Sequence, residues 1–247
     1  MHLEVPGPAG SLEALLDEGR SNLPGSTPIP RTAIQSTRGE LERPEPSSVT
    51  PRAAVVFAHP HPSQGGTMHT KAVFQGAKGL ARIGCAVLRF NFRGVGQSAG
   101  QFDEGLLRAY AASAGQGRGE MGDYQAALDW MAARYPGIPL WAAGFSFGAW
   151  VGLETGAADP RVSVLIAIAP PVDRSGYSYP HTLESTKPKF LIQGNLDELC
   201  PLKDMWAFYA KLKEPKELVV IDGANHLFEG KTEEVGDVLA ELLGDPE

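Results

Sequence analysis

The segment Gly144–Gly148 reads GFSFG and places one serine between two glycines, after an apolar run and before a stretch of small and apolar residues. This is the G-x-S-x-G pattern, in which a serine occupies a sharp turn between a strand and a helix. The turn is so tight that only very small residues fit two positions to either side of the serine. Two interpretations of Ser146 compete: a helix cap without chemistry, or a nucleophile exposed above a strand end. The strand-turn-helix context favours the nucleophile.

A serine hydroxyl is a weak nucleophile and needs a histidine base, which in turn needs a carboxylate to orient it. The segment IDGANHLF places His226 just after an expected strand, and LIQGNLDELCP places Asp197 after another. Two other carboxylates compete for the acid role: Glu198 is adjacent, and Asp173 in APPVD also follows a strand. The Gly-x-x-Asp turn resembles the acid loop of many triad enzymes and favours Asp197.

Acyl transfer also requires two N–H groups that bind the oxyanion. We expect the backbone N–H of Phe147, directly after the serine, to be one of them. The second should come from the loop AHPHPSQGGTMHT, where Pro60 has no N–H and His61 is the next candidate. His59 and His61 could also be read as zinc ligands, but no cysteine or acidic residue stands near them. We therefore expect no metal, and expect the two imidazoles to support the loop or line the pocket.

Strand and helix patterns alternate along most of the chain. Short apolar runs predict strands at 53–59, 85–92, 138–145, 161–170, 188–194 and 217–223. Helical spacing predicts helices at 67–84, 120–136, 147–157, 202–213 and 232–244. Such alternation is typical of βαβ units and a mostly parallel sheet flanked by helices. Ligands of these sheets bind at the carboxyl ends of the strands, and the candidate serine, acid and histidine all follow strands.

The N-terminal part has a different pattern. Residues 2–19 predict two short strands around a Pro-Gly-Pro turn, an antiparallel hairpin at one edge of the sheet. Residues 20–50 are rich in proline, serine and threonine and predict mainly surface loop, with at most one short strand. We expect one domain over 1–247, with this N-terminal segment at 1–52 and a catalytic core at 53–243.

The composition excludes several classes of protein. The 247 residues include 22 basic and 29 acidic side chains, for a net charge of −7, without a basic cluster, so we expect no nucleic-acid partner. Two cysteines, Cys85 and Cys200, are too few for a disulfide framework and fit a reducing compartment. The first residues do not read as a signal peptide, and no apolar run reaches the ~18 residues of a membrane span. We expect a cytoplasmic protein without a membrane partner; its oligomeric state stays open.

Two further motifs add a resemblance. HPHPSQGGTM (59–68) and FNFRGVGQSAG (90–100), together with G-x-S-x-G, are similar to those of small bacterial hydrolases of the α/β-hydrolase superfamily. The order Ser146, Asp197, His226 is also the order of that superfamily. The resemblance implies the α/β-hydrolase fold and a serine hydrolase or esterase activity. We expect Arg93 and Ser98, which lie in the second motif, to be structural, with Arg93 binding backbone or a carboxylate.

The chain departs from these relatives near the expected site. The stretch 106–118 reads as an insertion between GQFDEG and GRGEMGDYQ. Only about 18 residues separate two strands where larger relatives carry a helical lid, so we expect no large lid and an open site. The pocket side chains are expected to come from His59, Trp150, Tyr177 and Tyr179, although the tryptophan and tyrosines could equally be packing residues.

These patterns predict a serine hydrolase that cleaves a small carboxylic ester or related acyl bond through a Ser-His-Asp triad, without a cofactor. The triad alone does not distinguish an esterase from a thioesterase, peptidase or perhydrolase. A third possibility is a binding protein built on a hydrolase scaffold. The expected partner is a small-molecule acyl substrate.

Overall fold

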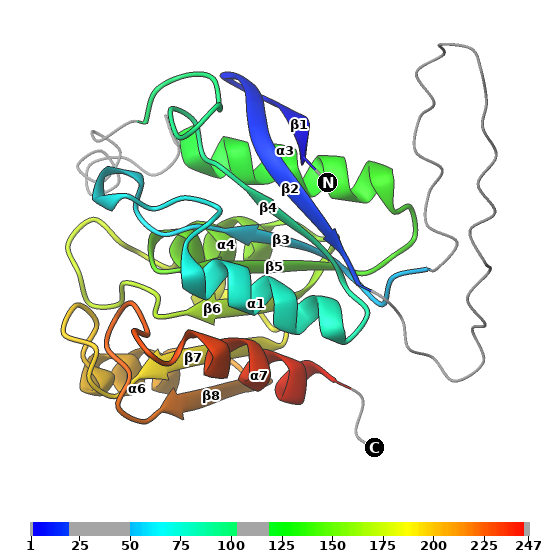
Figure 1. Ribbon diagram of the computed structural model, residues 1–247. Coiled ribbons are helices and arrows are strands. Elements are labelled where there is room, and N and C mark those ends of the chain that lie inside the picture. The colour runs from blue at the N-terminus through cyan, green and yellow to red at the C-terminus, as the bar shows by residue number, and fades with distance from the viewer. Residues whose placement is uncertain (1, 20–49, 103–118, 245–247) are drawn as a thin grey trace, which may run out of the picture.

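The computed structural model of the chain describes residues 2–19, 50–102 and 119–244, and the statements below concern these residues. Eight strands form one sheet in the order β1-β2-β4-β3-β5-β6-β7-β8 (Figure 1). The strands from β4 to β8 are parallel, whereas β1 and β2 pair antiparallel at one edge. Their bounds are β1 His2–Gly7, β2 Gly10–Glu18, β3 Ala54–Ala58, β4 Ala86–Phe90, β5 Leu140–Phe145, β6 Val162–Ile168, β7 Lys189–Gly194 and β8 Lys216–Ile221.

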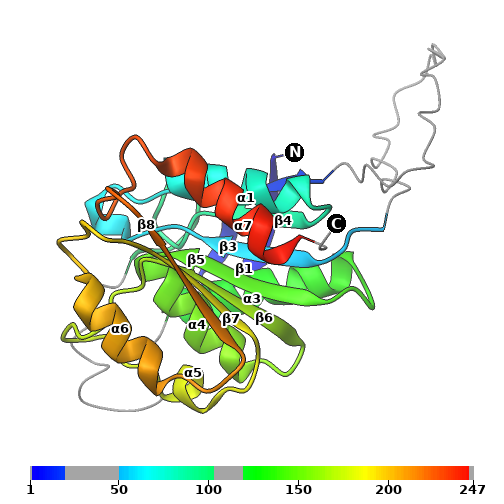
Figure 2. The same cartoon turned by 90° about the horizontal axis from the view of Figure 1, so that it is seen from below.

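Helices cover both faces of the sheet. Figure 2 shows α1 and α7 on one face and α3, α4 and α6 on the other. Their bounds are α1 Lys71–Arg82, α3 Gly119–Arg134, α4 Phe147–Ala158, α5 Pro180–Glu184, α6 Leu202–Lys211 and α7 Thr232–Leu243, with one 3-10 turn, η1, at Pro62–Gln64. This is the three-layer α/β arrangement that the alternating pattern predicts.

Strands β3 and β5 are apolar throughout because both of their faces are buried. In β3, Ala54, Val56 and Ala58 join the core beneath α3 and α4, whereas Val55 and Phe57 join the core beneath α1 and α7. Successive side chains of a strand point to opposite faces, so a strand between two helical layers is apolar at nearly every position. This burial on both faces explains the continuous apolar runs in the sequence of these strands.

The expected N-terminal hairpin is present. Strands β1 and β2 pair from His2↔Leu15 to Gly7↔Gly10, and β2 continues the sheet by pairing with β4. The proline-rich stretch 20–49 and the insertion at 106–118 lie outside the described residues, as does the short strand that the first of them could hold.

The observed elements match the expected ones to within a few residues at their ends, with two exceptions. Helix α1 begins at Lys71 rather than Thr67, because residues 67–70 form a separate turn closed by the Thr70 N–H and the Thr67 carbonyl, 2.9 Å apart. Helix α5 has five residues and was not predicted; it is the one helix in the segment between β6 and β7. That segment therefore holds no large lid.

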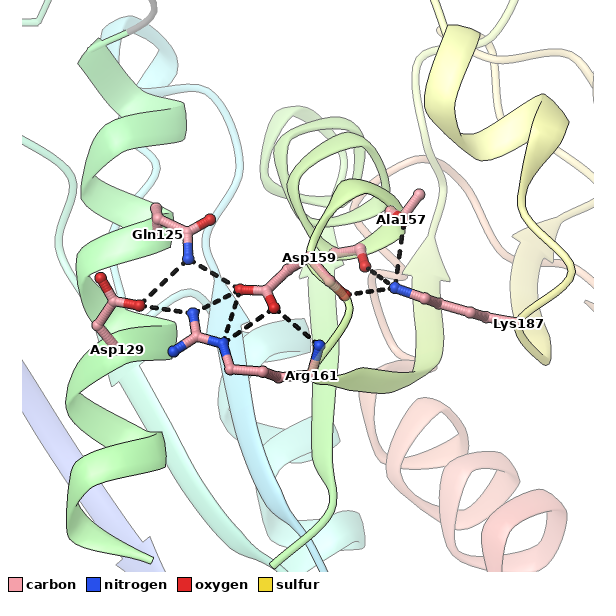
Figure 3. A network of polar contacts seen from close by, with 7 residues as sticks. Gln125, Asp129, Ala157, Asp159, Arg161 and Lys187 are labelled. Carbon is pink, nitrogen blue, oxygen red and sulfur yellow. Dashed lines mark hydrogen bonds and ion pairs between the residues drawn. The ribbon is translucent and has the colours of Figure 1, made fainter. Parts of the chain in front are cut away.

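Helix α4 begins directly after the candidate serine, and its C-terminal end is held by a polar network (Figure 3). The Arg161 guanidinium, 2.5 Å from both Asp159 and Asp129, joins the end of α4 to α3. Arg161 holds the pKa of the Asp159 carboxyl well below its usual range. The Lys187 ammonium donates to the carbonyls of Gly156, Ala157 and Asp159, which satisfies carbonyls that the helix leaves unpaired.

Candidate functional site

The Ser146 backbone has the conformation that the glycine pattern predicts. Its φ of 54° and ψ of −118° lie outside the regions that non-glycine residues normally occupy. Neighbouring contacts keep the backbone in this strained conformation. The Ser146 N–H donates to the Ile168 carbonyl, 2.8 Å away, and α4 starts at the next residue. This turn directs the chain straight from β5 into α4.

The two glycines of the pattern are needed because backbones meet there. A Cβ on Gly144 would collide with the Gly148 carbonyl, and one on Gly148 would lie 2.6 Å from the Ala58 carbonyl oxygen and also collide with that of His59. The first glycine lets the strand pass under the helix, and the second lets the helix approach the end of β3. The spacing of the motif is thus a steric consequence of the turn.

The structure brings the serine, the histidine and the favoured carboxylate together from three loops at the carboxyl ends of β5, β7 and β8, on the left of Figure 1. His226 Nε2 lies 2.9 Å from Ser146 Oγ, and His226 Nδ1 lies 2.8 Å from Asp197 Oδ2. A carboxylate can only accept, so Nδ1 carries the proton of the neutral imidazole and Nε2 accepts from the serine hydroxyl. Proton transfer from the serine to the imidazole is geometrically possible.

The Asp197 carboxylate is buried, and both of its oxygens accept hydrogen bonds. Its Oδ1 accepts from the backbone N–H groups of Leu199 and Cys200, at 2.9 and 2.8 Å, and Oδ2 also accepts from Gln193 Nε2 at 2.8 Å. Hydrogen bonds of this kind stabilise the charged form of a buried carboxylate. The competing acids, Asp173 and Glu198, have exposed side chains, and it is Asp197 that bonds the histidine.

A small cavity opens beside the serine. It has a volume of about 220 Å³, and among the described residues it is lined by His61, Gln64, Ser146, Pro171, Arg174, Ser175, Tyr177, Leu199, Cys200 and His226. Pockets for drug-sized ligands are usually ~300–1,000 Å³, so this cavity suits a small group. Burial raises the pKa of the Cys200 thiol to about 12, so this cysteine stays protonated and is no thiolate competitor for the serine.

The two residues expected to form an oxyanion hole lie next to this cavity. Phe147 is the first residue of α4, where a helix leaves N–H groups without an acceptor inside the helix. His61 lines the cavity, and its imidazole packs edge-on against the Phe147 ring with centroids 5.2 Å apart. The chain after His61 turns at Gly65, with φ of 79°, and passes so close to Pro60 that a Cβ on Gly66 would collide with its carbonyl.

His59 supports the loop rather than lining the cavity, a correction to its expected pocket position. The ring is fully buried; Nδ1 donates to the Pro60 carbonyl at 2.7 Å, and Nε2 accepts from the Phe92 N–H at 3.1 Å. Burial lowers the pKa of His59 to about 4, so the imidazole is neutral at pH 7. Both ring nitrogens are therefore used in holding two loops together.

Two of the three expected aromatic lining residues also lie in the core. Trp150 is fully buried and donates from Nε1 to the Ser178 carbonyl at 2.9 Å, and Tyr179 is packed against Phe208. Tyr177 does line the cavity, with its ring edge-on to Trp150 at 5.2 Å. The tryptophan thus supports the pocket wall from behind.

A hydrogen bond joins the two motifs that resemble those of bacterial hydrolases, residues 59–68 and 90–100. Asn91 Oδ1 accepts from the Met68 N–H at 2.8 Å, which joins the loop after β4 to the loop after β3. Arg93 binds the Asp123 carboxylate and the Gly119 carbonyl, as expected for a structural arginine. Ser98 donates to the Asn91 carbonyl, also a structural contact. Sequence reasoning missed Asn91, although a polar residue within the apolar stretch FNF is a signal that could have found it.

Two more residues of the site were missed. Gln193 is a fully buried amide at the end of β7, and its place in the otherwise apolar run FLIQG is the signal. Arg174 lies at the cavity one position after Asp173, where the sequence analysis considered only the neighbouring carboxylate. In the described part of the chain, no helix combines the length and the apolar character needed to cross a membrane.

The fold and the arrangement of the site define an α/β-hydrolase of the serine hydrolase type. The chain belongs to the family whose model is described as serine aminopeptidase, S33, which matches residues 49–187. An uncharacterized protein of Rickettsia prowazekii is 32% identical over 223 residues, covering 87% of this chain and 89% of the relative.

Solved structures agree with this assignment. A serine hydrolase homologue from Coxiella burnetii matches with a TM-score of 0.77 at 31% identity, covering 99% of this chain and 97% of that one. A serine hydrolase without a lid from Xanthomonas campestris matches with a TM-score of 0.74 at 30% identity, covering 98% of this chain and 92% of that one.

Proposed function

We propose that the protein hydrolyses a small carboxylic ester or a related acyl bond, with Ser146 as nucleophile, His226 as general base and acid, and Asp197 as the residue that orients the histidine. The observation that carries the proposal is the hydrogen-bond chain from Asp197 through His226 to Ser146, with links of 2.8 and 2.9 Å. A structural serine cap would need no such chain, and Ser146 makes no side-chain cap bond to α4.

In the first half of the reaction, Ser146 Oγ bonds to the substrate carbonyl carbon while its proton passes to His226 Nε2. The oxyanion binds the N–H groups of Phe147 and His61. The bond to the leaving alcohol then breaks, and the histidine returns its proton to the alcohol oxygen. Asp197 stabilises the imidazolium throughout and remains ionised.

In the second half, a water molecule gives a proton to His226 and its oxygen bonds to the acyl carbon. The bond to Ser146 breaks, the serine oxygen regains the proton, and a carboxylic acid leaves. No step requires a cofactor. The small cavity and the absence of a large lid between β6 and β7 favour short acyl groups.

The test is turnover of p-nitrophenyl acetate by the purified protein and by Ser146→Ala. We expect the variant to lose ~10³-fold or more of kcat, since members of a triad act as a unit. The matched control is Ser163→Ala, an exposed serine of β6 that bonds the Leu140 carbonyl away from the site. It should keep wild-type activity.

A fluorophosphonate probe separates this proposal from a non-catalytic binding protein. Labelling of the folded wild type but not of Ser146→Ala supports the hydrolase. Failure of the folded wild type to label, together with no ester turnover, would refute it. A panel of matched ester, thioester and amide substrates then ranks the alternative acyl bonds; the proposal requires the ester to be cleaved faster than the amide.

A further inference from the structure

The cavity beside Ser146 contains one permanently charged side chain among its described lining residues, Arg174. The others are the neutral or apolar groups named above and the two histidines, one of which belongs to the proposed triad. Neither aspartate nor glutamate lines this part of the cavity. A cation that lines the same cavity as the proposed nucleophile is a feature that hydrolysis of a neutral ester does not require.

The loop after β6 holds Arg174 at this position. Asp173 has a φ of 51°, and the Tyr177 N–H donates to the Arg174 carbonyl at 3.2 Å, so the chain turns back on itself around the arginine. Tyr177 in turn packs on the buried Trp150 ring. The guanidinium itself donates from Nη1 to the Leu199 carbonyl, 2.9 Å away. The loop across the cavity thus orients the side chain.

Within the described residues, that contact uses one guanidinium nitrogen, Nη1, and the side chain is exposed. A guanidinium has five N–H donors, and carboxylates and phosphates match its geometry. Over the ranges 2–19, 50–102 and 119–244, no carboxylate forms an ion pair with Arg174. This distinguishes it from Arg93 and Arg161, which are each neutralised by an aspartate.

The net negative charge of the protein bears on how an anionic substrate could reach the site. The protein carries a net charge of −7, which repels anions at long range. An anionic substrate therefore needs a local positive group at the site, and Arg174 supplies one beside the nucleophile.

We propose that Arg174 forms a subsite for an anionic group, a carboxylate or phosphate, on the acyl-bond substrate. This inference rests on the proposed function, because the subsite acts only on a substrate that Ser146 attacks. The substrate class is then a short ester with a negative charge a few bonds from the scissile carbonyl. The anion can lie on the acyl side or on the leaving-alcohol side, and the experiment separates the two.

The experiment compares kcat/KM for two pairs of esters. On the acyl side, mono-p-nitrophenyl glutarate is compared with p-nitrophenyl pentanoate, which has the same chain length and leaving group. On the alcohol side, 4-acetoxybenzoate is compared with phenyl acetate. Rates in the presence of Ser146→Ala are subtracted, which removes spontaneous hydrolysis.

We expect Arg174→Gln to lower kcat/KM for the anionic member of one pair about 10-fold, the size expected of a charge-assisted contact. The neutral members should change by less than about twofold, and Arg174→Lys should keep part of the preference. Raising the ionic strength should weaken the preference in the wild type but not in Arg174→Gln. The control for loss of one positive charge is Lys78→Gln, an exposed residue of α1 away from the cavity.

The outcomes separate the two proposals. If the wild type hydrolyses the esters but Arg174→Gln leaves the anionic-to-neutral ratio unchanged in both pairs, the subsite is refuted and the hydrolase is not. If Lys78→Gln lowers the ratio as much as Arg174→Gln, net charge is responsible and the subsite is again refuted. If the wild type turns over none of the esters, the proposed function fails, and the subsite with it.

Discussion

The stability of the protein should depend on pH through His59. This imidazole is buried and neutral, with a pKa lowered from 6.5 to about 4 because burial disfavours its charged form. In the unfolded chain it titrates near its ordinary value. Between these two values the unfolded state binds more protons than the folded state, so stability falls as the pH falls through this window.

The magnitude follows from the two pKa values. A difference of about 2.5 units corresponds to a limiting contribution of about 3 kcal/mol, at 1.36 kcal/mol per unit. Between pH 7 and pH 5 the linkage relation gives a loss of about 2 kcal/mol from this one residue, and the loss approaches its limit about one pH unit below the folded pKa. The carboxyl of Asp159, whose pKa is lowered, titrates below this range and contributes little to it.

The assay is urea unfolding of the wild type and of His59→Gln at pH 7, 6 and 5. The glutamine cannot titrate, so the free energy of unfolding of the variant should fall by about 2 kcal/mol less than that of the wild type between pH 7 and pH 5. The variant's lower stability at pH 7 cancels in this difference. NMR titration of the His59 ring in the folded wild type checks the pKa directly. Parallel pH profiles for the two proteins, or a His59 ring that titrates near pH 6.5, would refute the reasoning.

Two other substitutions test the site and the turn that supports it. Asp197→Asn should lower kcat for ester hydrolysis ~10³–10⁴-fold, because the amide favours the wrong imidazole tautomer. Glu198→Gln should have little effect on kcat. Equal losses of kcat in the two variants would reject Asp197 as the acid. Gly148→Ala should lower the free energy of unfolding in urea by about 3 kcal/mol, because its Cβ would lie 2.6 Å from the Ala58 carbonyl oxygen. The control is Gly122→Ala, where the atom nearest to the new Cβ would be Pro8 Cγ at 3.2 Å, and its free energy of unfolding should stay within about 1 kcal/mol of wild type. A similar loss of stability in both variants would argue against backbone contact as the cause.

The architecture could be predicted because each element carries a local signal. Strand β3 is apolar at every position, and α3 shows its buried stripe of Tyr124, Leu128 and Met131. The relative positions of Ser146, Asp197 and His226 followed from the fold alone, since the carboxyl ends of parallel strands meet at one edge. The comparisons confirm the α/β-hydrolase fold, while the catalytic roles of these three residues stay proposals.

Side-chain directions in α4 could not be predicted for a physical reason. All residues from 147 to 156 are buried, so the helix has no polar face from which to infer the direction of Trp150. The choice between lining and packing stayed open for Tyr179 because the loop around it depends on contacts with α6, far along the chain. His59 likewise gained its role from the Phe92 N–H, 33 residues away. Short-range patterns do not contain such pairings.

The position of Ser146 is fixed by packing more than by its partners in the proposed triad. The turn is closed by glycine contacts with the end of β3 and by a backbone hydrogen bond to β6, while Arg161 and Lys187 hold the far end of α4. None of these contacts involves His226 or Asp197. Because the strained serine is maintained without the histidine, removing the imidazole should abolish the proposed proton transfer and leave Ser146 in place. The turn requires the motif glycines but not the Arg174 side chain, so the role proposed for that side chain concerns the substrate rather than the fold.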